Sequence, residues 1–161
     1  NTVGGAVFAH GELSQGKNFR CGEAGHMTLV PDGGLCYCGK KGCLDVYCSA
    51  KRLADTKEGN LEAFFSALKA GEEKSAALWE DYTDKLAVAV NNLHMILDCD
   101  IVLGGYVGSY LESYLDAVWK KIYQRNTFGE SMPFVRACRY QRGAAALGAG
   151  LRVIESFLET V

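Results

Sequence analysis

The sequence predicts an α/β domain in which helices pack on a partly parallel, mixed sheet. Strand-like segments come first, and helical and strand-like segments then alternate to the end of the chain, which is the order typical of a layered α/β domain. Residues 73–97 also carry apolar side chains at the 3.6-residue period of a helix. With 161 residues, 48% of them hydrophobic, the chain is long enough to bury a sizeable core.

The first segment, residues 3–9 (VGGAVFA), is apolar and compatible with a strand. A second extended stretch ends near residues 26–30, and Gly-rich turn material lies between the two. This pattern predicts antiparallel strands joined by turns. Residues 31–34 (PDGG) then open a loop rich in cysteine.

Three helical segments follow this loop. Residues 43–54 have helix-forming composition and close near Asp55. The next helix is predicted to begin at a cap, Asn60, and to end at Gly71. In the third, residues 73–97, one stripe holds Leu78, Tyr82, Leu86, Ala89, Leu93 and Ile96. We interpret this stripe as the buried face of a long amphipathic helix that could also pair with a second subunit.

The last third of the chain alternates between strand-like and helical segments. Residues 100–105 (DIVLGG) form a short apolar strand that ends in two glycines, and residues 109–124 are helical. A strand is expected from Phe134, followed by a helix over residues 144–158. Because this last helix is rich in Ala and Gly at its start, we expect it to pack closely against another surface.

Composition and charge exclude several classes of protein. The formal net charge of −2 provides no basic face, so we expect no contact between this chain and nucleic acid. No apolar run approaches the ~20 residues that span a bilayer, and from the polar start of the sequence we expect no secretory leader. The seven cysteines are odd in number, so we expect a cytoplasmic protein rather than a disulfide framework. Outside the loop, we interpret the cysteines as small core residues: Cys21, Cys48, Cys99 and Cys138.

The loop CYCGKKGC offers three thiolates, from Cys36, Cys38 and Cys43. Zinc takes four such ligands in a tetrahedron. Gly39 and Gly42 let the backbone turn tightly enough to direct all three cysteines inward. Lys40 and Lys41 are interpreted as solvated charges.

The best candidate for the fourth ligand is His26, which lies ten residues upstream at the entrance to the loop. His10 and His94 have no such relation to the loop, and Cys48 falls within a helical pattern. We therefore predict a closed structural Zn²⁺ site. Free surface thiols remain an alternative, and a redox pair is disfavoured because C-x-C is not the usual C-x-x-C spacing.

Two motifs together resemble the signature of the ROK family, named for repressors, open reading frames and kinases. They are GEAGH (residues 22–26) and CYCGKKGCLD (residues 36–45), which match Glu-x-Gly-His and Cys-x-Cys-Gly-x-x-Gly-Cys-x-Glu in spacing. VGGA near the start is similar to the family's phosphate segment, and DIVLGGYVG (residues 100–108) to its adenosine-side turn. The resemblance covers essentially the whole chain.

The resemblance implies an actin-like (RNase H-like) ATPase fold of two lobes with a cleft between them. Residues 1–161 would form the C-terminal lobe alone, with a zinc loop at residues 26–45. The chain lacks an initial Met and opens in mid-strand, so we expect it to be a fragment. The N-terminal lobe and its catalytic Asp would be missing partners, and no catalytic residue is assigned here. ROK-like proteins are commonly homo-oligomers.

The resemblance also assigns roles to single residues. Glu23 would accept hydrogen bonds from sugar hydroxyls, and His26 would bind zinc with one ring nitrogen while the other faces the sugar. Asp45 would contact the same sugar, although the family usually has the longer Glu there. The nucleotide-binding glycines would be Gly4, Gly5, Gly104 and Gly105. Kinases of the family usually have Gly-Thr-Gly before the first pair, where this chain has Asn-Thr-Val.

Two functions follow from this resemblance. The favoured one is the sugar-binding lobe of a transcriptional regulator that responds to a carbohydrate or sugar phosphate. The alternative is the C-terminal lobe of a kinase that uses ATP and Mg²⁺ to phosphorylate a hexose or N-acyl hexosamine. The altered phosphate segment and Asp45 favour the regulator. A zinc-ribbon interaction module would explain the cysteines but not GEAGH. In any case, we do not expect this chain alone to catalyse phosphoryl transfer.

Overall fold

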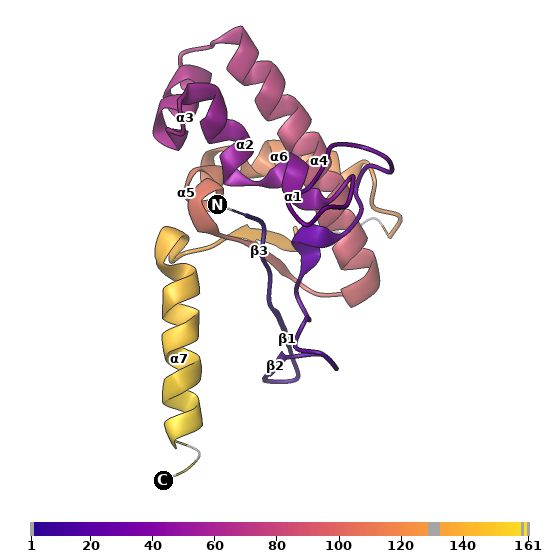
Figure 1. The fold of residues 1–161 in the computed structure, drawn as a ribbon, viewed down its shortest axis with the longest axis vertical. Coiled ribbons are helices and arrows are strands. Elements are labelled where there is room, and N and C mark those ends of the chain that lie inside the picture. Colours follow the sequence, from indigo (N-terminus) through magenta and orange to yellow (C-terminus); the bar gives the residue numbers. More distant parts are fainter. Residues whose placement is uncertain (1, 129–132, 159, 161) are drawn as a thin grey trace. The chain divides into compact units, whose positions relative to one another are not determined.

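A computed structural model describes residues 2–128, 133–158 and 160 (Figure 1). The chain divides into two compact units, Asn1–Val90 and Asn91–Val161. The long helix α4 (Glu73–Leu97) contributes to both of them. Each unit contains its own short pair of strands and its own buried side chains.

The first unit opens with a hairpin of β1 (Val7–Ala9) and β2 (Glu12–Ser14), which pair antiparallel with Phe8 opposite Leu13. His10 and Gly11 form the turn with φ of 55° and 82°, as a two-residue hairpin loop requires. The antiparallel prediction is confirmed, but the second strand lies at residues 12–14. Residues 26–30 contribute only an isolated bridge between Thr28 and Cys43.

The cysteine loop leads into two short helices, α1 (Leu44–Cys48) and α2 (Ala50–Ala54). The single helix predicted over residues 43–54 is interrupted at Ser49, whose ψ of 151° is extended. A short 3-10 turn, Asp55–Lys57, closes α2 near the predicted residue.

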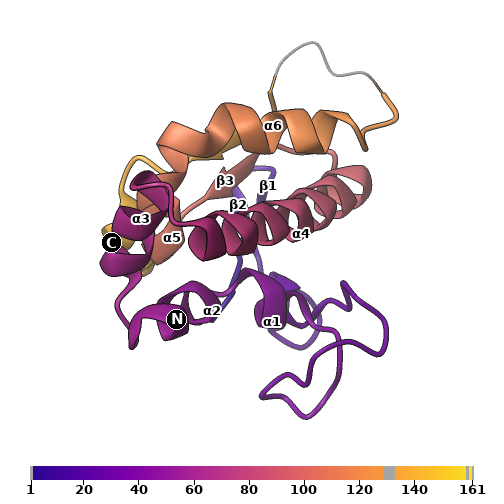
Figure 2. The ribbon, with the colours of Figure 1, turned by 90° about the horizontal axis from the view of Figure 1, so that it is seen from above.

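Helix α3 (Leu61–Lys69) begins at its predicted cap, because the Asn60 side-chain oxygen accepts a 3.0 Å hydrogen bond from the Ala63 amide. Gly71, with φ of 82°, ends this segment, and α4 then runs over the predicted residues without interruption (Figure 2).

The core of the first unit is aromatic. Phe64 is fully buried and meets Phe65 edge-to-face at 5.3 Å. Phe65 meets Trp79, which stacks on Tyr82 at 5.3 Å. The Tyr82 hydroxyl donates a 2.7 Å bond to the Cys48 carbonyl and so links α4 to α1. The stripe on α4 is buried only in part, since Leu86 and Ala89 are buried whereas Ile96 is 77% exposed, against the prediction.

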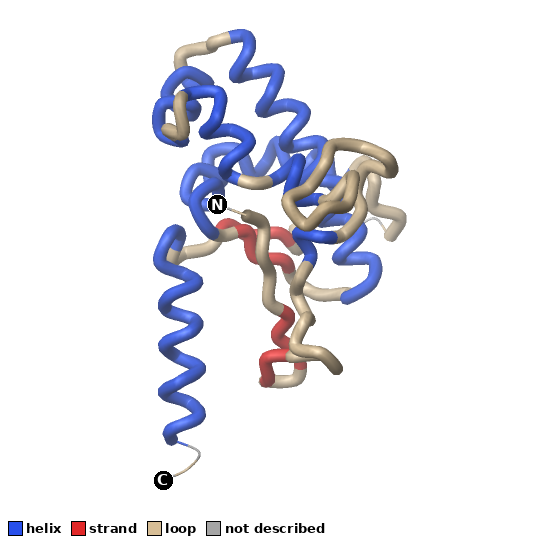
Figure 3. The backbone as a smooth tube through the Cα atoms, viewed as in Figure 1, coloured by secondary structure: helices blue, strands red, loops and turns tan. Residues whose placement is uncertain are grey.

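The second unit contains the parallel pair that the sequence predicts. Strands β3 (Ile101–Leu103) and β4 (Val135–Ala137) run parallel, with Ile101 opposite Val135. The two strand pairs belong to separate two-stranded sheets, so the described residues form no single mixed sheet (Figure 3). Between β3 and β4, the predicted helix is divided into α5 (Gly105–Leu111) and α6 (Leu115–Tyr123) by a 3-10 turn, Glu112–Tyr114.

The core of the second unit gathers around Phe134. His94 stacks on its ring with centroids 3.5 Å apart, and Trp119 meets it edge-on at 5.1 Å. Val118 and Ile122 of α6 are fully buried. His94 Nδ1 lies 3.0 Å from the Cys99 carbonyl, so this histidine is a core residue, which agrees with its low rank as a zinc ligand.

Helix α7 (Ala144–Leu158) has the predicted bounds but not the predicted burial. Its apolar side chains are exposed, with Ile154 at 55% and Phe157 at 65%. A 3-10 turn, Gln141–Gly143, precedes it. None of the helices in the described part of the chain is long and apolar enough to cross a membrane.

Candidate functional site

The four predicted zinc ligands lie together in the first unit. The ligating atoms of His26, Cys36, Cys38 and Cys43 are all within 4.8 Å of one another. His26 Nδ1 lies 3.9 Å from Cys36 Sγ, and Cys38 Sγ lies 3.7 Å from Cys43 Sγ. All seven cysteines are free of disulfides, so this cluster is a set of thiols rather than a disulfide knot.

These distances fit zinc. Two thiolates bound at about 2.3 Å with tetrahedral angles lie about 3.8 Å apart, which is close to the spacing of Cys38 and Cys43. Three sulfur ligands and one imidazole make a complete set of protein ligands. A metal held here would therefore have a structural role, with no open position for water.

Backbone conformation explains how eight residues direct three sulfurs inward. Gly39 and Gly42 have φ of 82° and 80°, in the left-handed region that favours glycine. The Gly42 carbonyl accepts bonds from the amides of Leu29 (2.7 Å) and Val30 (3.1 Å). A Cβ on Gly42 would collide with the Val30 carbonyl, whereas one on Gly39 would meet nothing within 4 Å. Both glycines thus adopt the turn conformation that the sequence predicts, and only Gly42 also lacks room for a Cβ.

The thiols of the metal-free cluster differ in acidity. The backbone N–H of Lys40 and neighbouring thiols lower the pKa of Cys38 to about 7. Burial, and then its hydrogen bond to Cys38, raise the pKa of Cys43 to about 11.

The second ring nitrogen of His26 faces away from the thiols. Its Nε2 lies 3.0 Å from the hydroxyl of Tyr37, and the two rings meet at 5.2 Å and 65°. A metal bound at Nδ1 would place the ring proton on Nε2, where the Tyr37 hydroxyl would accept it. The side chain of Tyr37 is 68% exposed. Partial desolvation, followed by the charge of Asp45, raises the pKa of its phenol, which is therefore neutral at pH 7.

Tyr37 was not identified from the sequence. It occupies a position of the motif that specifies no residue type, and its role depends on the geometry of the loop. The nearest sequence signal is an aromatic side chain between two metal ligands.

Glu23 precedes the 3-10 turn Ala24–His26 and is exposed. The glycines around it have a packing role. Gly22 (φ 92°) and Gly5 approach so closely that a Cβ on Gly5 would lie 2.7 Å from the Gly22 carbonyl oxygen. A Cβ on Gly25 would collide with the Val3 carbonyl. The GEAGH turn is thus packed directly against the N-terminal segment.

Asp45 is placed differently from Glu23. It is buried, with 7% of its surface exposed, and its carboxylate accepts a hydrogen bond from the backbone N–H of Val3. This bond ties the N-terminal segment to α1. Sugar contact by Asp45 stays a prediction, and the observed contact gives its carboxylate a structural role.

A second set of contacts attaches the cysteine loop to α4. The Tyr47 hydroxyl accepts a 2.8 Å bond from the Gly34 amide. Arg52 donates to the Tyr47 carbonyl at 2.9 Å and to Asp81 of α4 at 2.8 Å. That hydrogen bond from Arg52 is the main reason that the pKa of Asp81 lies below its usual value.

The predicted nucleotide-binding glycines lie in different units. Gly4 and Gly5 belong to the first, whereas Gly104 and Gly105 follow β3 in the second. Gly105 has φ of 74° and begins α5, and a Cβ on Gly104 would lie 3.2 Å from Cβ of Cys138. A tight strand-to-helix turn is confirmed here, and nucleotide binding stays a prediction.

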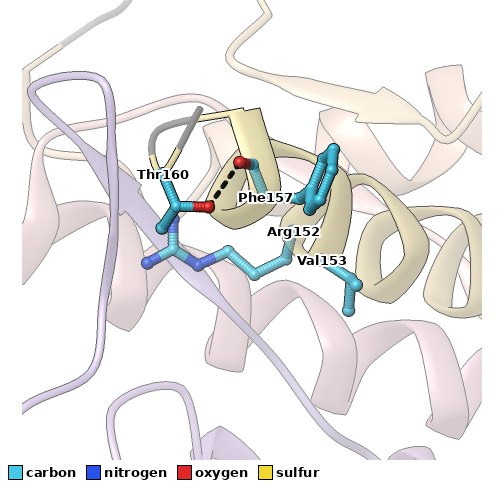
Figure 4. A pocket seen from close by; sticks show the side chains of 4 residues that line it. All are labelled: Arg152, Val153, Phe157 and Thr160. Carbon is cyan, nitrogen blue, oxygen red and sulfur yellow. Dashed lines mark hydrogen bonds between the residues drawn. The ribbon is translucent and has the colours of Figure 1, made fainter.

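One hollow on the surface lies elsewhere. It is lined by Arg152, Val153, Phe157 and Thr160 at the C-terminal end of α7, where the Thr160 hydroxyl donates a 2.7 Å bond to the Phe157 carbonyl (Figure 4). It contains no predicted site residue. Three of the four cysteines expected in the core, Cys21, Cys99 and Cys138, are only partly buried, and Cys48 is buried as predicted.

Comparison with curated proteins finds relatives that act on sugars. The chain is 30% identical over 155 residues to the N-acetylmannosamine kinase of Citrobacter koseri, covering 92% of this chain and 52% of that protein. A similar match is found to the enzyme of the same name from Salmonella typhi. The chain spans about half the length of these curated relatives.

Solved structures agree with the fold. The ROK hexokinase of Thermus thermophilus superposes with a TM-score of 0.78 at 28% identity, over 96% of this chain and 55% of that one. A ROK glucokinase of Streptomyces griseus, solved with glucose and AMPPNP, gives 0.76 at 23% identity, over 92% and 56%. A ROK transcriptional regulator gives 0.64 at 20% identity, over 76% and 35%. The mixed α/β structure is thus that of actin-like ATPase-fold proteins.

Comparison with family models also identifies ROK proteins, over nearly the whole chain. The model described as "ROK family" matches residues 2–155. That range includes both motifs and both pairs of glycines. This chain therefore belongs to the ROK family.

Proposed function

We propose that this chain is the sugar-binding half of an ATP-dependent ROK sugar kinase that acts on a hexose or N-acyl hexosamine. The observation that carries the proposal is the two-sided arrangement of His26. One ring nitrogen lies among three thiols, and the other faces outward. The exposed Glu23 lies three residues away in the same turn.

The sequence favoured a regulator over a kinase, and the comparisons reverse that order. The relative at 30% identity and the structure at 28% are both named as kinases. The regulator matches at 20% identity and over a smaller part of this chain. We therefore adopt the kinase and keep the regulator as the alternative.

In this proposal the residues of this chain bind and orient the sugar. His26, Cys36, Cys38 and Cys43 would hold a zinc ion, which supplies a fixed ring orientation for His26. The N–H at Nε2 would then be a positioned donor for a sugar hydroxyl, and the Glu23 carboxylate an acceptor. Neither group transfers the reacting proton, so both lower the barrier only by positioning the acceptor.

Nucleotide binding would use the backbone of the glycine segments. Gly4 and Gly5 carry no side chain that could cover their N–H groups, which suits contact with phosphates. Gly104 and Gly105 would lie on the adenosine side. Mg²⁺ would accompany ATP in the complete kinase.

The remaining half of the kinase would also cover exposed apolar surface. The apolar side chains of α7 are exposed, as are Phe8 of β1 (67%) and Val102 of β3 (60%). Both sheets have only two strands, and such pairs are marginally stable without further strands or packing. In this proposal residues 1–161 form one lobe, and a polypeptide equivalent to the other half of its relatives packs on it.

The test is calorimetric titration of the zinc-loaded chain with N-acetylmannosamine and with glucose. We expect at least one of them to bind, and Glu23→Gln to weaken binding roughly tenfold or more, since it replaces a charged acceptor by a neutral one. Glu12→Gln, an exposed Glu of β2, is the matched control and should bind normally.

A further titration with a non-hydrolysable ATP analogue separates the two functions. Nucleotide binding supports the kinase. Sugar binding without any nucleotide binding supports the regulator. Failure of the wild type to bind either sugar would contradict both.

A further inference from the structure

Tyr37 is an exposed aromatic residue whose position the motif does not explain. Its hydroxyl lies 3.0 Å from His26 Nε2, the nitrogen that the proposed function directs toward sugar. Its ring contacts the imidazole edge-on, and 68% of its surface is exposed. The contact with His26 is the one hydrogen bond of its side chain recorded among the described residues.

The two carboxylates of the predicted sugar site, Glu23 and Asp45, differ in exposure. Asp45 is buried and its carboxylate is engaged with the Val3 amide. The Tyr37 hydroxyl lies beside Nε2 of His26, and the exposed Glu23 belongs to the same turn as this histidine, so both are groups that a ligand at His26 would meet. A sugar hydroxyl that accepts from His26 Nε2 comes within reach of the Tyr37 hydroxyl, because the two protein atoms are 3.0 Å apart.

The chemistry of the phenol suits such a ligand. A hydroxyl that accepts from His26 still has its own proton to donate and a further lone pair to accept with. The aromatic ring adds an apolar face beside these polar atoms, and the combination of a few placed polar groups with an aromatic wall is typical of small-molecule sites. The C–H face of a pyranose ring has matching character.

We propose that Tyr37 is a third sugar-contacting residue, which shares the Nε2–H of His26 with the sugar and donates its own proton to a sugar hydroxyl while its ring lies against the sugar. This inference rests on the proposed function, because it concerns the same sugar site. It assigns a specificity role to a position between two metal ligands, since the sugar hydroxyl that reaches Tyr37 is selected by its stereochemistry.

The alternative is that Tyr37 keeps the sugar away from His26, and this role predicts the opposite change in sugar affinity when the hydroxyl is removed. If Tyr37 only blocked His26, the sugar would have to displace it. Removal of the hydroxyl would then strengthen binding. The sign of the change in affinity on Tyr37→Phe therefore decides between a contact and a block.

The experiment is calorimetric titration of the zinc-loaded wild type and Tyr37→Phe with N-acetylmannosamine and with glucose. We expect unchanged zinc content and a roughly two- to tenfold weaker affinity for whichever sugar the wild type binds, the effect of one neutral hydrogen bond. Tyr123→Phe, which removes the hydroxyl of another exposed tyrosine (51%), should bind like the wild type.

Monodeoxy analogues of the bound sugar give a stricter readout. For one hydroxyl position, the deoxy sugar should bind more weakly than the parent to the wild type but equally well to Tyr37→Phe, because both changes remove the same bond. Equal or tighter binding of the parent sugar by Tyr37→Phe, or the absence of any such coupled hydroxyl, would overturn the inference and leave the proposed function intact. Absence of sugar binding by the wild type would overturn both.

Discussion

The hydrogen bond between Asp45 and the Val3 amide makes a specific prediction about stability. Asp45 is 7% exposed, and its bond connects α1 to a segment 42 residues earlier in the chain. A hydrogen bond to a charged group contributes roughly 1.5–3 kcal/mol to the free energy of unfolding. For a chain of this length, 1 kcal/mol corresponds to about 2–4 °C in Tm. Asp45→Ala should therefore lower Tm by roughly 3–12 °C.

The assay is thermal unfolding followed by circular dichroism, with saturating zinc for every variant so that metal occupancy does not differ. Glu12→Ala is the control, because it removes an exposed carboxylate and should change the free energy of unfolding by no more than about 0.5 kcal/mol. Asp45→Asn keeps a neutral acceptor for the Val3 amide, so its Tm should lie between those of Asp45→Ala and Glu12→Ala. Amide hydrogen exchange adds a local readout, since Val3 should be protected in the wild type and lose protection in Asp45→Ala. A Tm for Asp45→Ala equal to that of the control would refute the structural role of this carboxylate.

Three further predictions concern the core, the loop and the acid response. Phe64→Ala removes a fully buried ring and should cost about 3–5 kcal/mol, measured by urea unfolding; a loss under 1 kcal/mol would contradict the aromatic core. Gly42→Ala should weaken zinc binding much more than Gly39→Ala in a competition with a chelator, because only the first meets a backbone carbonyl; equal effects would argue against the described turn. The pKa of Asp81 is lowered, chiefly by Arg52, so the stabilisation from this pair is present above the usual carboxyl pKa and is lost as the pH falls below about 4. In Asp81→Asn the free energy of unfolding should fall less steeply as the pH is lowered, and a pH profile equal to that of the wild type would count against a stabilising pair of Arg52 and Asp81.

The local pattern of residue types in the sequence was sufficient to predict the long helices. The 3.6-residue period and flanking signals predicted the bounds of α4 and α7 and the cap at Asn60. The break at Ser49 was missed because one serine within a helical composition does not require an extended ψ, although serine is common where helices begin. The position of β2 was missed because its three residues lie between Gly11 and Gly16, and so short a run cannot show the alternation of a strand.

The ligand cluster could also be predicted from sequence, since zinc geometry and two glycines restrict where the cysteines lie. The roles of Tyr37 and Asp45 could not. Both depend on contacts between segments distant in sequence or on the orientation of one ring, which spacing does not specify. Burial of α7 was predicted from its composition, but the described residues supply too little surface to cover it.

Zinc content is the most direct test of the central claim that His26 is held by a metal on one side so that its other nitrogen is directed outward. We would measure zinc per chain by atomic emission on protein purified without added metal, for the wild type, His26→Ala and the control His10→Asn. We expect about one zinc per chain in the wild type and in the His10→Asn control, and a sharp loss of zinc in His26→Ala. No zinc in the wild type, or zinc that persists without His26, would contradict the claim, because the outward nitrogen would then have no fixed orientation.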